Sequence, residues 1–61
     1  MKQRDVIRIL IKNGFIISRS SKHLIYTNGK VTVAVPHQKE LSKGLTRRLL
    51  CQAQLKHEIN F

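Results

Sequence analysis

The spacing of hydrophobic residues changes along the chain, and each spacing predicts a different element. Apolar side chains first recur with a helical period over residues 3–13, in a sector made of Val6, Ile7, Ile9, Leu10 and Ile11. Asn13-Gly14 follows, and glycine accepts the left-handed backbone conformation that often ends a helix. We therefore predict a first helix over residues 3–13.

The period then shortens to two, which is typical of β-strands. Three segments rich in β-branched and aromatic residues have this period: Phe15–Arg19, His23–Thr27 and Lys30–Val35. Pro36 ends the third segment, because proline has no amide proton to donate to a neighbouring strand. The pattern therefore predicts three consecutive strands.

The Asn28-Gly29 dipeptide between the last two segments is a strong signal for a two-residue hairpin turn. Counting from such a turn places Tyr26 opposite Val31 and His23 opposite Ala34. One face of the hairpin then holds the apolar residues Leu24, Tyr26, Val31, Val33 and Val35. Because His23 falls on the other face, beside a small neighbour, we expect its ring to be reachable from solvent.

A second helical pattern follows a polar loop. Ser42 is a good N-cap, and the apolar residues Leu45, Leu49, Leu50 and Ala53 predict a helix over residues 43–54. Cys51 lies within this helix, and we expect it to be a buried, inert thiol. Lys56–Phe61 shows no pattern, and we predict a flexible C-terminal tail.

The order of elements is thus α-β-β-β-α, an α+β fold. We expect a three-stranded antiparallel sheet with both helices on one face, the topology of a double-stranded-RNA-binding domain. At 61 residues the chain has room for one small domain, which we place at residues 1–55, followed by the tail at 56–61.

Charge narrows the range of partners. Twelve Lys and Arg oppose three Asp and Glu, which gives a net charge of +9. This excess favours a polyanionic partner, with nucleic acid ahead of an anionic membrane surface or an acidic protein. A stripe of cations can also be merely a solvated face. The candidates for contacts to RNA are Arg19, Lys22, Lys30, His37 and Arg47.

Several other classes of protein are disfavoured. A single cysteine excludes an intramolecular disulfide framework and a multi-cysteine zinc site. No apolar run is long enough to span a membrane, and charged residues interrupt the N-terminal segment, which is unlike a signal peptide. We therefore expect a cytoplasmic protein.

Few side chains can perform chemistry near neutral pH. His23 is the candidate general acid or base, since Lys22 and Arg19 lie close in sequence and can stabilise charge on a phosphate. This set suits RNA cleavage, in which a base activates a ribose 2′-OH against the adjacent phosphorus without a metal or cofactor. The alternative is an exposed histidine with no role. His37 fits a loop-positioning or phosphate-contact role better, and His57 is expected to be solvated.

Four segments together resemble one protein family. They are the first helix with its Asn13-Gly14-Phe15 exit, Ser20–Tyr26 around His23, Val31–His37 with its Pro-His ending, and Lys39–Gly44 with the helix that follows. In this order they are similar to the HicA-type toxins of bacterial and phage toxin–antitoxin modules. The resemblance covers about Lys2 to Leu55.

The resemblance implies a metal-independent endoribonuclease, an mRNA interferase that arrests growth, with His23 as its catalytic histidine. It also implies a cognate HicB-type antitoxin that covers the site. Two positions depart from the family pattern: Ser20 stands where the family usually has glycine, and Lys22 stands where many members have a second histidine. If Lys22 occupies the catalytic position, the chain is an inactive toxin.

Rival functions predict different behaviour. A non-catalytic RNA-binding module of the same fold binds RNA and leaves it uncut. A basic DNA-binding accessory protein binds duplex DNA and RNA alike, because phosphate contacts do not distinguish them. A membrane-active peptide is disfavoured by the strand pattern, since no helix is long enough to act alone.

Overall fold

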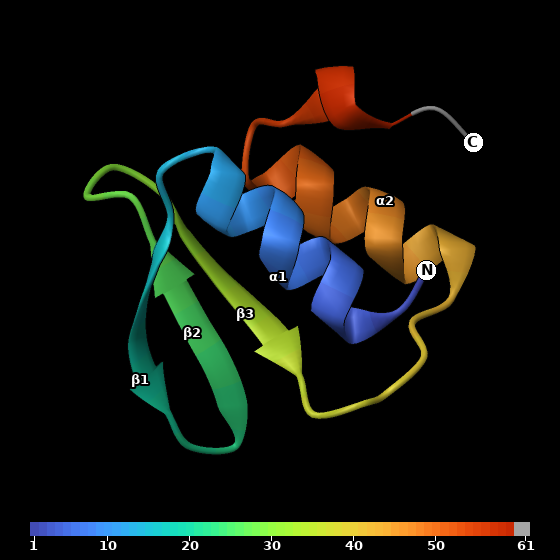
Figure 1. Cartoon of the computed structure of the whole chain (residues 1–61), viewed down its shortest axis with the longest axis horizontal. Helices are drawn as coiled ribbons and strands as arrows, with labels where there is room; N and C mark the ends of the chain where they lie inside the picture. The colour runs from blue at the N-terminus through green and yellow to red at the C-terminus, as the bar shows by residue number, and fades with distance from the viewer. Residues whose placement is uncertain (60–61) are drawn as a thin grey trace.

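The architecture is that of a small sheet covered by helices on one face. A computed structural model describes residues 1–59. The elements are α1 (Gln3–Lys12), β1 (Ile16–Ser20), β2 (His23–Thr27), β3 (Thr32–Pro36), α2 (Lys43–Gln52) and the 3-10 helix η1 (Lys56–Glu58). The strands are antiparallel in the order β1-β2-β3, and α1 and α2 lie side by side over one face (Figure 1). The predicted α-β-β-β-α fold is confirmed.

A single apolar core lies between the sheet and the two helices. Its buried members are Val6, Leu10, Phe15, Tyr26, Val33, Val35, Leu41, Leu49, Leu50, Ala53 and Leu55. The helical sector predicted for α1 is only partly buried: Ile7 and Ile9 pack against the core, whereas Ile11 is 56% exposed. All five residues of β1 are exposed, because β1 is an edge strand that the helices do not cover.

Both helices end with the same backbone motif. At the end of α1 the Phe15 amide donates to the Leu10 carbonyl (2.9 Å) and the Gly14 amide donates to the Ile11 carbonyl (3.1 Å). Gly14 has φ of 88°, the left-handed conformation that this Schellman motif requires. The motif turns the chain so that Phe15 packs into the core one residue before β1 begins, and the predicted helix stop is confirmed.

The end of α2 repeats the motif without glycine. The Leu55 amide donates to the Leu50 carbonyl (2.7 Å) and the Gln54 amide donates to the Cys51 carbonyl (3.0 Å). Gln54 has φ of 61° and takes the left-handed position. The helix therefore ends at Gln52 and not at the predicted residue 54, and Leu55 packs into the core beyond it. Its start is as predicted, with the Ser42 hydroxyl accepting from the Leu45 amide (3.1 Å).

The predicted hairpin register is wrong by two residues. Thr27 is opposite Thr32, and His23 is opposite Pro36 and not Ala34. The cause is the Asn28 side chain, whose Oδ1 accepts from the amides of Lys30 (2.9 Å) and Val31 (2.8 Å) and so stabilises a longer loop. Because side chains alternate with a period of two, a shift of two leaves the core face and the open face as predicted.

One further expectation needs correction. Cys51 is exposed and not buried. In the predicted tail, Lys56–Glu58 forms η1 and Ile59 packs against the core. The flexibility of this segment stays a prediction, and Asn60 and Phe61 lie outside the described residues. Among residues 1–59, no helix is both long and apolar enough to cross a membrane.

Replacing Gln54 tests the end of α2. An L-residue in the left-handed region is strained, so we expect Gln54→Gly to raise the free energy of unfolding by about 0.5–1 kcal/mol. The matched control is Gln52→Gly in the last turn of the same helix, which should lower it by about 0.5 kcal/mol because glycine is a poor helix former. Thermal or urea unfolding measures both. A loss of stability in Gln54→Gly would contradict the strained geometry.

Candidate functional site at the β1–β2 hairpin

The candidate site is centred on the tip of the β1–β2 hairpin. Ser20 and Leu24 are the last paired residues of the two strands, and the Ser21 amide donates to the His23 carbonyl (3.1 Å) across the tip. Ser21, Lys22 and His23 are all exposed. The short connection therefore presents Lys22 and His23 together at one end of the sheet.

Arg19 reaches the same face as His23 because of a β-bulge. The register between β1 and β2 shifts between Ile17, which is opposite Tyr26, and Arg19, which is opposite Ile25. Without the shift, Arg19 would lie opposite Leu24 and share its core-facing side. The extra residue in β1 instead aligns Arg19 with Ile25, on the open face that also holds His23. Neighbouring open-face positions thus carry a guanidinium and an imidazole.

His37 is tied to the hairpin tip from the neighbouring strand. Its Nε2 lies 3.0 Å from the Ser21 carbonyl oxygen. A carbonyl can only accept, so a hydrogen bond here requires a proton on Nε2. His37 follows Pro36, the partner of His23 across β2 and β3, and so reaches the tip directly. The contact joins His37 to the hairpin loop, and the role of His37 stays a prediction.

Ser20 occupies the family's glycine position without unusual backbone geometry. It is the last residue of β1 and pairs with Leu24. Among non-glycine residues in the described part of the chain, Gln54 alone has positive φ. A glycine is therefore not required at this position for the chain to reach His23.

The remaining predicted site residues lie elsewhere. Lys30 is in the β2–β3 loop, beyond the far end of β2, and one five-residue strand spans about 13 Å. Arg47 is exposed on α2, across the sheet from the open face. The structure thus brings Arg19, Lys22, His23 and His37 together, and leaves Lys30 and Arg47 apart from them.

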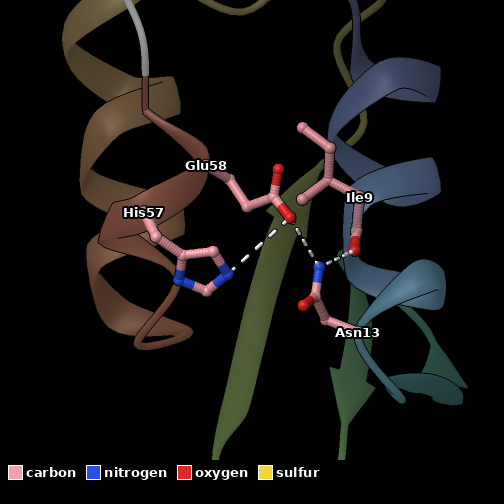
Figure 2. A network of polar contacts seen from close by, with 4 residues as sticks. All are labelled: Ile9, Asn13, His57 and Glu58. Atoms are coloured by element: carbon pink, nitrogen blue, oxygen red, sulfur yellow. Dashed lines mark hydrogen bonds and ion pairs between the residues drawn. The ribbon is translucent and has the colours of Figure 1, made fainter.

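His57 belongs to a separate network near the end of α1 (Figure 2). The Asn13 side-chain amide donates to the Ile9 carbonyl (2.8 Å) and to Glu58 Oε2 (3.2 Å), and His57 Nε2 lies 3.7 Å from that oxygen. These contacts hold η1 against α1, and η1 and the β1–β2 hairpin are at opposite ends of the molecule in Figure 1. The His57 side chain is 66% exposed, as expected for a solvated residue.

The hairpin site has the features needed to handle a phosphodiester. Within residues 1–59 no side chain forms a hydrogen bond or ion pair with the His23 ring, so both ring nitrogens are available to a substrate. Arg19 and Lys22 supply positive charge beside it. In the same part of the chain no group of three or more His, Cys, Asp and Glu side chains is placed to hold a metal ion. The arrangement suits proton transfer beside a stabilised anion.

Sequence reasoning missed two features that arrange this site, a β-bulge and a hydrogen bond. A one-residue bulge in β1 gives no signal in a strand of alternating residues. The bond from His37 to Ser21 joins residues 16 apart in sequence, and only the strand register reveals it.

Removing the His37 ring should loosen the hairpin tip. We expect His37→Ala to leave the fold intact but to speed amide hydrogen exchange at Ser21 and His23 several-fold, because the Ser21 carbonyl loses its partner. The control is His57→Ala, an exposed histidine at the other end of the molecule. Exchange at the tip that is equal in both variants would mean that His37 does not hold the hairpin.

One comparison with known proteins gives a match. A family model described as the HicA toxin of bacterial toxin–antitoxin systems matches residues 3–55. No curated protein and no solved structure matches the chain significantly. The match spans both helices, all three strands and the whole hairpin site. The chain belongs to the HicA toxin family of bacterial toxin–antitoxin modules, in which a toxin is paired with an antitoxin.

Proposed function

We propose that this toxin is an endoribonuclease that cleaves mRNA, with His23 as its catalytic acid–base group. The observation that carries the proposal is the exposed, unengaged His23 ring on the same face as Arg19, at the tip that also presents Lys22. The family match supports the class of protein, and the net charge of +9 supports a polyanionic substrate. A catalytic histidine must be accessible to its substrate, which gives a reason for the exposure of the His23 ring.

The chemistry needs only groups that the RNA and this chain supply. His23 removes the proton from a ribose 2′-OH, and the 2′-oxygen attacks the adjacent phosphorus. A bond from phosphorus to the 2′-oxygen forms, the bond to the 5′-oxygen breaks, and the leaving 5′-oxygen takes a proton from water or from the protonated imidazole. The products are a 2′,3′-cyclic phosphate and a 5′-OH. Arg19 and Lys22 stabilise the negative charge that develops on the phosphoryl oxygens.

The roles of the other predicted residues follow from their positions. His37 holds the tip by its bond to the Ser21 carbonyl and acts as a positioning residue. Lys30 and Arg47 lie too far from His23 to touch the same phosphate, so any contact they make is to other parts of the RNA. The reaction requires no metal ion and no cofactor.

A HicB-type antitoxin would inhibit the toxin by covering the hairpin site. An acidic segment lying on the open face would compete with RNA for Arg19 and Lys22, because both partners present negative charge to the same cations. The chain itself leaves this face open: β1 is exposed throughout and both helices lie on the opposite side of the sheet.

Cleavage by the purified chain tests the proposal. We expect the unmodified protein to cut single-stranded RNA in the presence of EDTA and to leave 2′,3′-cyclic phosphate ends. His23→Ala should lower the cleavage rate by about 100-fold or more, which is typical for loss of a general base. His57→Ala should cut as the parent does. Induction in cells should arrest growth with fragmented RNA for the parent and for His57→Ala only.

Other outcomes identify the rival functions. RNA that is bound but never cut, by parent and His23→Ala alike, would show a non-catalytic RNA-binding module. Equal affinity for duplex DNA and RNA without cleavage would show a nucleic-acid-binding accessory protein. If the His23→Ala variant still cleaves RNA, His23 is not the catalytic residue and another side chain performs the cleavage.

A further inference from the structure

A basic hollow lies at the start of α1, outside the hairpin site. It has a volume of about 110 Å³ and is lined by Lys2, Gln3, Arg4 and Lys39. A water molecule occupies about 30 Å³ of the liquid, so the hollow has room for a small anion or a few water molecules. Three of the four residues that line it are cationic, and none is acidic. None of the residues predicted to contact RNA lines it.

Backbone bonds fix the two segments that form the hollow. Lys2 and Glu40 pair as an isolated antiparallel bridge. The Gln3 amide donates to the Lys39 carbonyl (3.0 Å) and the Leu41 amide donates to the Met1 carbonyl (2.9 Å), on either side of that bridge. The ladder holds Lys2 and Lys39 close together although they are far apart in sequence. The backbone positions of these two residues are therefore set by the fold.

Charge at the hollow is only partly neutralised. Arg4 lies 3.9 Å from Asp5 in an exposed ion pair, with the arginine side chain 71% exposed, so Arg4 contributes less than a full charge. Neither Lys2 nor Lys39 forms an ion pair with a carboxylate among residues 1–59. Glu40 pairs with Lys2 through the backbone and does not line the hollow. The two lysines are therefore the charges available to an anion.

The hollow and the hairpin site lie at the same end of the sheet. The Gln3 side-chain amide donates to the Pro36 carbonyl (2.8 Å), and Pro36 is the strand partner of His23. Lys39 follows Pro36 by three residues, so its Cα lies within about 16 Å of the Cα of His23. One extended nucleic-acid strand can therefore reach both places at once.

We propose that the hollow lined by Lys2, Gln3, Arg4 and Lys39 binds a backbone phosphate of the RNA strand whose scissile phosphate lies at His23. The proposal rests on the proposed function for its substrate class and adds a second anchor on the strand. Cationic residues at the hollow hold the strand by charge and not by base identity, so this anchor is independent of RNA sequence. It fixes the direction in which the strand leaves the hairpin, along the loop from Pro36 to Lys39.

Binding of a fluorescein-labelled single-stranded RNA tests the hollow. The measurement is fluorescence anisotropy over a range of salt concentrations, in a His23→Ala background so that the RNA stays intact. The test variant carries Lys2→Gln and Lys39→Gln, and the matched control carries Lys12→Gln and Lys56→Gln, two exposed lysines on other parts of the surface. Both variants lose two charges, and circular dichroism checks that both are folded.

We expect the test variant to bind RNA about five- to tenfold more weakly than the parent. Its log–log dependence on salt should be shallower by about 0.7, the value for one phosphate contact on a single strand. The control should keep the parent's slope. Equal losses in both variants would mean a general effect of charge and would overturn the proposal, as would parental binding by the test variant.

A second probe separates RNA from an acidic protein partner. If the test variant binds poly-glutamate more weakly but RNA as well as the parent, the hollow accepts carboxylates and the proposal is wrong. Cleavage by the unmodified chain decides the nuclease separately. If RNA binding depends on the hollow but no RNA is cleaved, the proposal for the hollow stands and the proposed nuclease activity is wrong. If RNA is cleaved but binding does not depend on the hollow, the nuclease stands and the proposal for the hollow is wrong.

Discussion

One apolar layer stabilises this chain, and the position of that layer decides where function can be placed. A chain of 61 residues can fill a single core, so α1 and α2 both pack on the same face of the three-stranded sheet. The opposite face receives no cover from the chain itself, and the edge strand β1 is exposed along its whole length. The open face, which carries His23 and Arg19, is thus a consequence of how little apolar material the chain has.

The ends of the two helices show which parts of this layer the sequence could predict. Asn13-Gly14 predicts the end of α1 because glycine takes the left-handed position freely, and Phe15 then enters the core. The same motif ends α2, but there Gln54 occupies the strained left-handed position. Glutamine gives no local sequence signal for such a helix end. Burial of Leu55 beyond the turn gives a physical reason for that conformation, and burial is a property of the whole fold.

The strand pairing likewise shows that the local pattern predicts some features, whereas long-range contacts determine others. Alternation with a period of two correctly assigns the core face of the β2–β3 hairpin even though the pairing was misplaced by two residues. The displacement came from the Asn28 side chain, which stabilises a longer loop than Asn-Gly alone suggests. At the hairpin tip, the exposure of His23 was predictable. The bulge that aligns Arg19 with Ile25 and the bond from His37 to Ser21 were not, because neither follows from periodicity.

The loop that leaves β3 explains why two basic sites lie at one end of so small a domain. Pro36 stops the strand beside His23, His37 bonds back to the hairpin, and Lys39 joins the ladder at the start of α1. One short segment therefore sets the spacing between the hairpin and the hollow, and both gain charge from a chain with few carboxylates. Two separated basic sites favour a ligand that repeats its negative charge along its length over a compact anion. A nucleic-acid strand has that form, and so does an acidic protein segment.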